Sequence, residues 1–328
     1  MVSILRSNQP IAWLIVPITG LCWLLLSLWV TEFALGSLSI QALGSLTAAT
    51  LTHRIYVRYD FVERGDPALA WLSMVLLLLL MPVESSGVAI RSWTALLLLL
   101  TTTDCVLQVH RQPLTSGLQF RSGALAALSV FLEPQLFGFV IAVAIVFGIS
   151  RPFIFREWTM MSLGLFWIFA LASTAHAFCP DLIQPVFASS DVPLRQDFNN
   201  RLISPDTARI WLIALSLWGA LLMAREKSKI SLRARTTRWH LMILFCVSIV
   251  IGMLIHPPAL LVISRELPPA FDPNFHGVLD KVLAIGVAFG VVGLVPVSQR
   301  RHGASAKTAV LKMFVIVGSL LILFMPSV

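Results

Sequence analysis

Residues 11–30 read IAWLIVPITGLCWLLLSLWV and contain no charged side chain. An α-helix needs about 20 apolar residues to cross the hydrocarbon core of a bilayer, so this stretch is long enough to span. No short apolar core with a small-residue cleavage pattern comes before it, as a cleaved leader would require. The segment therefore predicts a retained transmembrane helix near the start of the chain.

The composition extends this prediction to the whole chain. The 328 residues are 57% hydrophobic and 12% charged, with a mean hydropathy of +0.86. A soluble domain carries about 25% charged residues. We therefore expect an all-α fold, a polytopic transmembrane helical bundle that forms a single integral membrane domain over residues 1–328.

Further apolar stretches follow the first and are separated by short polar connections, several of which contain proline. They predict eleven membrane segments, including short or re-entrant half-helices. The segments are 11–30, 36–52, 67–83, 91–108, 121–133, 135–150, 157–178, 207–224, 239–256, 278–298 and 307–327. Segment 36–52 is weak as an independent span because it is rich in Gly, Ser and Thr, and 121–133 and 135–150 are weak because they are short.

The junction between segments 121–133 and 135–150 leaves two alternatives for Glu133. A pair of half-helices would enclose a cavity near Glu133, because irregular backbone at membrane depth needs protein or water around it. A tight helical hairpin at the outer surface would instead leave Glu133 in water.

Basic residues distinguish the two sides of the membrane, because Lys and Arg accumulate in cytoplasmic loops. With a cytoplasmic N-terminus and a periplasmic C-terminus, 18 of the 24 Lys and Arg residues fall on the inner side. Residues 225–238 form a basic cytoplasmic loop, and 179–206 and 256–277 form the long outer (periplasmic) loops. This asymmetry accounts for the net charge of +8, so we expect membrane lipids as partners and no nucleic acid.

The sequence contains no familiar soluble-enzyme motif in a usable context, neither a phosphate-binding glycine loop nor a nucleophile elbow. The four cysteines, Cys22, Cys105, Cys179 and Cys246, have no metal-ligand or disulfide spacing, and we expect them to be buried. The sequence predicts neither a metal site nor a cofactor. Any chemistry then depends on isolated ionisable residues near helix ends.

Several of these ionisable residues lie on the predicted outer side. Arg91, Arg265 and Lys281 can hold a phosphate or lipid headgroup, since Arg binds phosphate with two parallel hydrogen bonds and Lys acts as a point charge. His256 and His276 can transfer a proton near neutral pH. The alternative is a hydrated surface with local ion pairs that contribute little.

Asp104 follows three threonines near the inner end of segment 91–108. A carboxylate inside an apolar segment is expensive and is often functional, so Asp104 is a candidate for proton coupling in a transporter. Its closeness to the cytoplasmic boundary favours simple solvation instead.

The stretch Arg151-Pro152-Phe153-Ile154-Phe155-Arg156-Glu157-Trp158 lies between two apolar segments. It resembles the R-P-F-x-x-R-E-W motif of a family of polytopic membrane proteins of Bacteroidota, a domain of unknown function. The opening Leu5-Arg6-Ser7-Asn8-Gln9-Pro10 is similar to that family as well. The resemblance implies a multi-pass protein of the bacterial inner (cytoplasmic) membrane.

Within this motif we expect an elbow at the cytoplasmic interface. Arg151 and Arg156 are placed to contact lipid phosphate, and Glu157 can pair with a neighbouring helix. The aromatic residues of the motif are expected to enter the membrane interface, as aromatic belts do. They are Phe153, Phe155 and Trp158.

The order of segments is also similar, at the level of the fold, to multi-span lipid-linked glycosyltransferases. This likeness of fold transfers no catalytic residue. Membrane glycosyltransferases that use polyprenyl-linked donors place an acidic general base in the first outer loop, which makes Glu32, directly after the first span, the catalytic candidate. The alternative is a carboxylate that is solvated at the interface. The leading hypothesis is a protein of cell-envelope biogenesis that handles a polyprenyl-phosphate-linked sugar or lipid at its periplasmic face. The alternative is a non-catalytic subunit of a larger envelope complex, in which Gly36, Ser37, Gly44 and Ser45 permit close helix packing. The third hypothesis is a lipid or solute transporter.

Overall fold

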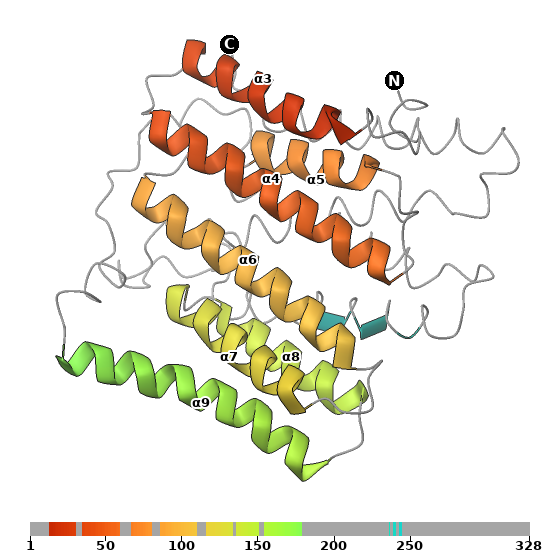
Figure 1. Ribbon diagram of the computed structural model, residues 1–328, viewed down its shortest axis with the longest axis vertical. Coiled ribbons are helices and arrows are strands. Elements are labelled where there is room, and N and C mark those ends of the chain that lie inside the picture. Colours follow the sequence, from red (N-terminus) through yellow and green to blue (C-terminus); the bar gives the residue numbers. More distant parts are fainter. Residues whose placement is uncertain are drawn as a thin grey trace, which may run out of the picture.

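The computed structural model describes residues 13–30, 35–59, 67–80, 86–109, 116–133, 136–150 and 154–178, together with Thr236, Trp239, His240, Ile243 and Leu244. Within these ranges there are seven α-helices and no strand, which confirms the all-α prediction for this part of the chain (Figure 1). The helices are α3 (Ile15–Val30), α4 (Leu35–Arg58), α5 (Ala68–Leu80), α6 (Ser86–Val109), α7 (Ser116–Leu132), α8 (Phe137–Ser150) and α9 (Phe155–Phe178).

Each of these helices coincides with one of the first seven predicted segments. The largest differences concern α4, which continues to Arg58, and α6 and α7, which begin five residues early at Ser86 and Ser116. Of the last four predicted segments, 207–224, 278–298 and 307–327 lie outside the described residues, and only four residues of 239–256 are described. The long outer loops also lie outside, so the count of eleven segments stays a prediction.

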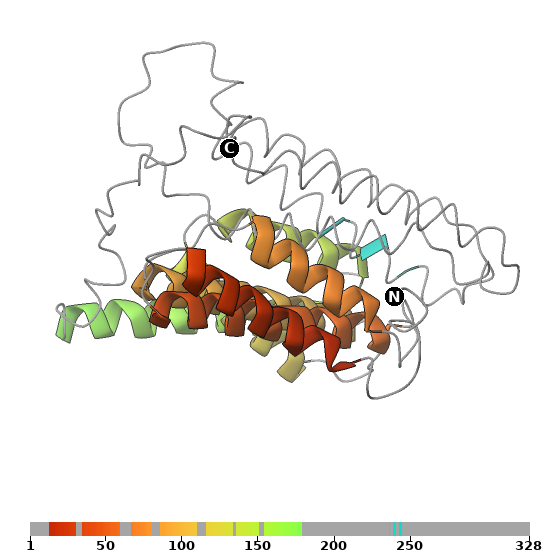
Figure 2. The ribbon, with the colours of Figure 1, turned by 90° about the horizontal axis from the view of Figure 1, so that it is seen from above.

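Five helices lie side by side in the order α3, α4, α6, α7 and α9, and we call this arrangement the row (Figure 1). Helix α5 packs against α3 and α4, and α8 packs against α6 and α7, on one side of the row (Figure 2). The chain runs back and forth, so that α4, α6 and α8 run opposite to the other four helices (Figure 1). Helices α4 and α6 are therefore parallel neighbours.

Helix α4 is polar for a predicted membrane segment, and its position in the row explains how this is tolerated. It lies between α3 and α6 with α5 behind it. Gln41 is fully buried, and its Oε1 accepts a hydrogen bond from Trp93 Nε1 of α6 at 3.1 Å. The buried hydroxyls of Ser45 and Thr52 donate to carbonyl oxygens of their own helix. The polar residues that make segment 36–52 weak as an independent span therefore lie on a face that the protein covers.

Small residues of α4 provide close packing within the chain. A Cβ atom at Gly44 would collide with the indole ring of Trp93. Ser37 and Ser45 are buried beside it. The expectation of close helix packing is thus confirmed at Gly44, but the packing joins helices of this chain and supplies no argument for a partner protein. Gly36 is exposed, with open space around it.

Helices α7 and α9 approach each other through two further glycines. A Cβ atom at Gly123 would collide with the backbone carbonyl of Met161, and one at Gly164 would collide with that of Phe120. Because backbone atoms cannot rotate away, only glycine permits this separation between the helices. Helix pairs in membranes commonly depend on such small residues.

The apolar core joins α4, α5, α6 and α8. It includes the largest fully buried side chains, Tyr59 and Phe147, and also Trp93. Leu244 belongs to the same cluster, so predicted segment 239–256 contributes to this core.

Candidate functional site

The two edge helices of the row expose large apolar side chains. On α3, Leu21, Leu25 and Trp29 are 60%, 64% and 86% exposed. On α9, Phe166 and Phe178 are 70% and 83% exposed. Soluble monomers rarely expose contiguous apolar surface on this scale, whereas lipid tails stabilise it.

Two described helices are long and apolar enough to cross a membrane, namely Ser86–Val109 and Phe155–Ala175. The best apolar window of the first is 61% buried, as in the core helix of a soluble protein, but that of the second is only 11% buried. An exposed apolar helix of this length is stable in lipid and not in water. Helix α9 therefore indicates association with a membrane.

The cysteines differ from the expectation that all are buried. Cys22 is exposed on α3, and Cys105 is half-buried on α6. The expectation is wrong for Cys22, because α3 is an edge helix and an apolar thiol fits a lipid-facing surface as well as a core.

Exposed threonine hydroxyls find partners within their own helices. Thr47, Thr94 and Thr174 each donate to the carbonyl oxygen four residues earlier, at 2.8, 2.7 and 2.7 Å. Hydrocarbon offers no hydrogen-bond partner, so a polar group that faces it must be satisfied by the protein. These exposed faces are compatible with lipid despite their hydroxyls.

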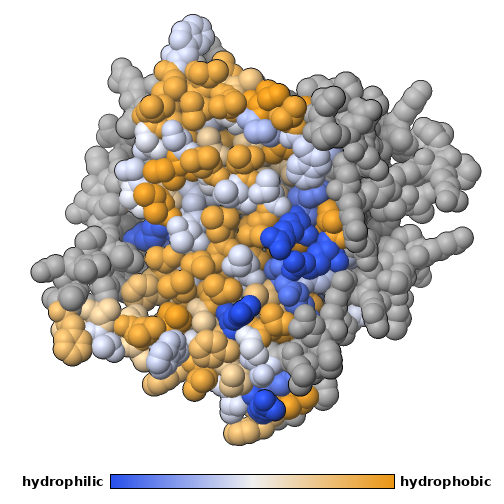
Figure 3. Space-filling view, in the orientation of Figure 1, coloured by the Kyte–Doolittle hydropathy of each residue, from blue (hydrophilic) through white to orange (hydrophobic). Residues whose placement is uncertain are grey.

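Four arginines lie at one end of the row, where α4 ends and where α7 and α9 begin. Arg54, Arg121 and Arg156 are exposed, and the Arg58 side chain is 33% exposed. We call this end the basic end; all four arginines belong to the side that the sequence assigned to the cytoplasm. Hydrophilic residues form a few separate groups on a face that is otherwise largely apolar (Figure 3).

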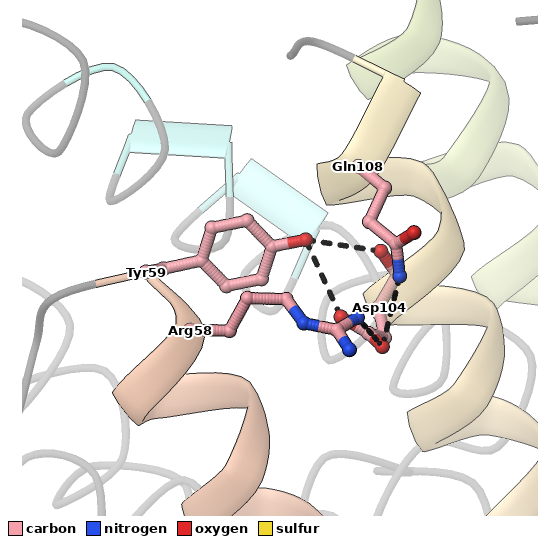
Figure 4. Close-up of polar contacts among 4 residues, drawn as sticks. All are labelled: Arg58, Tyr59, Asp104 and Gln108. Atoms are coloured by element: carbon pink, nitrogen blue, oxygen red, sulfur yellow. Dashed lines mark hydrogen bonds and ion pairs between the residues drawn. The ribbon is translucent and has the colours of Figure 1, made fainter. Parts of the chain in front are cut away.

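A polar network ties α4 to α6 at the basic end (Figure 4). Arg58 Nη1 donates to Asp104 Oδ2 at 2.5 Å, and Gln108 Nε2 donates to the same oxygen at 3.0 Å. The Tyr59 hydroxyl lies 3.3 Å from Asp104 Oδ1 and 3.1 Å from the Asp104 carbonyl oxygen. Both carboxylate oxygens of Asp104 therefore have donors.

The expectation of a solvated Asp104 is wrong. Its side chain is only 15% exposed, and the guanidinium of Arg58 compensates its charge. Helices α4 and α6 run in parallel, which brings the last turn of α4 beside Asp104. A carboxylate held by a permanent cation and two further donors is suited to fixing the two helices together, and this arrangement weakens the argument for proton coupling.

A second ion pair lies at the opposite end of the row. Arg91 Nε of α6 donates to Glu133 Oε1, just after α7, at 3.1 Å. The Glu133 side chain is 8% exposed and that of Arg91 is 26% exposed. Glu133 is therefore neither in open water nor unpaired, and the hairpin alternative that left it solvated is wrong. The structure places Arg91 against it, because α6 and α7 are antiparallel neighbours.

The described part of the R-P-F-x-x-R-E-W stretch packs against α8. The rings of Trp158 and Phe147 meet edge to face with centroids 5.2 Å apart. Glu157 is buried, whereas Arg156 and Phe155 are exposed. Trp158 thus joins α9 to the last turn of α8, and its expected role in the membrane interface stays a prediction.

The remaining predicted site residues lie outside the described residues. They are Glu32, Arg151, Pro152, Phe153, His256, Arg265, His276 and Lys281. Of the predicted outer phosphate ligands, the structure therefore describes Arg91 alone.

Sequence reasoning missed the partners of Asp104. Arg58, Tyr59 and Gln108 were not singled out, although a usable signal was present. The predicted topology had already placed Arg58 and Asp104 at the same side of the membrane, at the ends of segments that run in the same direction. A buried carboxylate needs a cation, and the nearest arginine on that side was the natural candidate.

The chain matches no family model, no curated protein and no solved structure. The resemblance of the R-P-F-x-x-R-E-W stretch to a Bacteroidota family stays a prediction, and any statement about function depends on the geometry above.

Proposed function

We propose that this chain is a multi-pass protein of the bacterial inner membrane that acts in cell-envelope biogenesis. In this proposal it binds a polyprenyl-phosphate-linked sugar or lipid at its periplasmic face. The observation that carries the proposal is the position of Arg91, a partly exposed guanidinium held by a buried carboxylate. Arg91 belongs to a molecule whose edge helices, α3 and α9, expose large apolar side chains of the kind that lipid tails stabilise.

Arg91 has the chemistry of a phosphate ligand. The bond to Glu133 uses its Nε, and a guanidinium has five N–H donors in a planar fork. A buried carboxylate that fixes one donor also fixes the plane of the fork, so less side-chain freedom is lost when an anion binds. The same carboxylate lowers the local positive charge, which limits the affinity for phosphate.

Glu133 therefore orients the guanidinium of Arg91 but also weakens its attraction for phosphate, and these two effects can be separated by experiment. The full chain is reconstituted in vesicles and exposed to a photoreactive polyprenyl phosphate sugar, and covalent capture is measured. Glu133→Gln keeps a polar group beside Arg91 but removes the competing charge, so we expect capture to rise about fivefold. The double variant Arg91→Gln with Glu133→Gln retains an uncharged polar pair, and we expect it to lose capture.

A purely structural ion pair would behave differently. Both single variants, Arg91→Gln and Glu133→Gln, would lower thermal stability, the double variant would restore it, and capture would stay unchanged throughout. That result would overturn the proposal for Arg91. Arg156→Gln, which removes an exposed arginine at the basic end, is the matched control and is expected to leave capture unchanged.

A further inference from the structure

The least buried face of α6 forms a continuous stripe between α4 and α7. Most residues of the inner half of α6 are buried, but one face is only partly so. Its residues recur at helical spacing and are Leu97, Leu98, Thr101, Asp104, Cys105 and Gln108. The neighbouring helices of the row, α4 and α7, flank this stripe on its two sides.

The stripe changes in character along its length. It begins with two leucines, passes Thr101, and ends in the network around Asp104 at the basic end. From Leu97 to Gln108 the helix rises by about 16 Å. This is close to half of the roughly 30 Å hydrocarbon core, which is the depth of one leaflet.

Positive charge lies on both sides of the polar end of the stripe. On α4, Arg54 is exposed, and on α7, Arg121 is exposed. The charges of Arg58 and Arg121 both act on the Cys105 thiol, so these two helices bring cations toward the same part of α6. Asp104 offsets the charge of Arg58. Arg121 then leaves a net positive charge beside the stripe, and Arg54, one turn before Arg58 on the same side of α4, adds to it.

We infer that this face of α6 binds one anionic phospholipid, with its phosphate beside Arg121 and Arg54 and an acyl chain along Leu98 and Leu97. Three observations support this occupant: the charge at one end, the apolar surface at the other, and a length that matches one leaflet. A helix of a partner protein would not require a surface that changes from charged at one end to apolar at the other. The site is at the opposite end of the row from Arg91 and does not depend on the proposed polyprenyl phosphate function.

The test uses the purified full chain, delipidated in detergent and then offered phosphatidylglycerol or phosphatidylcholine with identical acyl chains. Native mass spectrometry counts the retained lipids, and thermal unfolding reports stabilisation by lipid. We expect one retained phosphatidylglycerol and about fivefold weaker retention of phosphatidylcholine, since a basic residue near an anionic lipid contributes on this scale. Arg121→Gln should reduce retention of phosphatidylglycerol to that of phosphatidylcholine.

A matched control separates this site from general attraction to the basic end. Arg64→Gln removes the same charge from the predicted inner side, in the connection between α4 and α5, and we expect it to leave retention unchanged. Thr101→Trp should block the acyl chain and lower retention of both lipids. If Thr101→Trp fails to fold, the retention of phosphatidylglycerol by Arg121→Gln is the deciding measurement, because Arg121 is exposed and its substitution does not disturb the core.

Three results would overturn the inference. The first is equal loss of phosphatidylglycerol in Arg121→Gln and Arg64→Gln, which would indicate diffuse attraction. The second is equal retention of the two lipids by the unaltered chain. The third is a stoichiometric partner protein that shields Cys105 from a thiol reagent in native membranes and leaves it reactive after removal.

Discussion

Helices α6 and α9 are equally long, with 24 residues each, and both are apolar enough to cross a membrane. Their surroundings are opposite, because α6 has neighbours on both sides of the row and α9 lies at its edge. Accordingly, α6 carries the polar side chains that need protein partners, including Asp104 and Arg91. Hydropathy predicted both helices equally well, and the position of their ionisable residues distinguishes the inner helix from the edge helix.

The largest effect is expected where α9 joins the row. Gly164→Leu places a side chain against the backbone of α7 at Phe120, so the two helices must separate. We expect a loss of more than about 3 kcal/mol in unfolding free energy, since overpacking against backbone cannot be relieved by rotation. The measurement is reversible unfolding in mixed micelles.

Gly117→Leu is the control for this substitution, because a Cβ atom at Gly117 meets nothing within 4 Å. Equal destabilisation by Gly117→Leu and Gly164→Leu would show that helix propensity or hydrophobicity, and not the close approach of α7 and α9, determines the result.

A smaller effect should separate the interior of α6 from the exposed face of α9. Leu96 is fully buried, and Leu163 is 52% exposed. We expect Leu96→Ala to cost about 2 kcal/mol through lost packing and a residual cavity, and Leu163→Ala to cost less than about 0.5 kcal/mol. Thermal unfolding of the two variants in the same detergent gives the comparison. Similar losses would mean that the exposed face of α9 is packed against protein.

The smallest effect concerns the pair between α4 and α6. Arg58→Gln leaves the Asp104 carboxylate with donors from Tyr59 and Gln108, so we expect a loss of about 1 kcal/mol. Adding Asp104→Asn removes the uncompensated charge and should restore most of that stability. Arg54→Gln, one turn earlier on α4 and exposed, should have no measurable effect on unfolding. Additive losses in the double variant would contradict a coupled pair.

The helices could be predicted from the sequence because each one is an apolar run interrupted by polar or proline-containing connections. Their arrangement could not, because Arg58 and Asp104 are 46 residues apart and become neighbours only when α4 and α6 run in parallel. Burial was hardest to predict for α4, where Gln41 and His53 look like surface residues in the sequence but are covered by neighbouring helices. Among the candidate site residues, Arg91 gained a partner that spacing alone could not identify.

The contact between Gly44 and Trp93 has a consequence for how such chains can diverge. The indole occupies the volume that any side chain at position 44 would need, and its Nε1 also donates to Oε1 of the buried Gln41. In related chains a larger residue at position 44 should therefore appear only together with a smaller residue at position 93. When Trp is lost there, position 41 should become apolar in the same lineage. An alignment of relatives would then show these three positions changing as a unit.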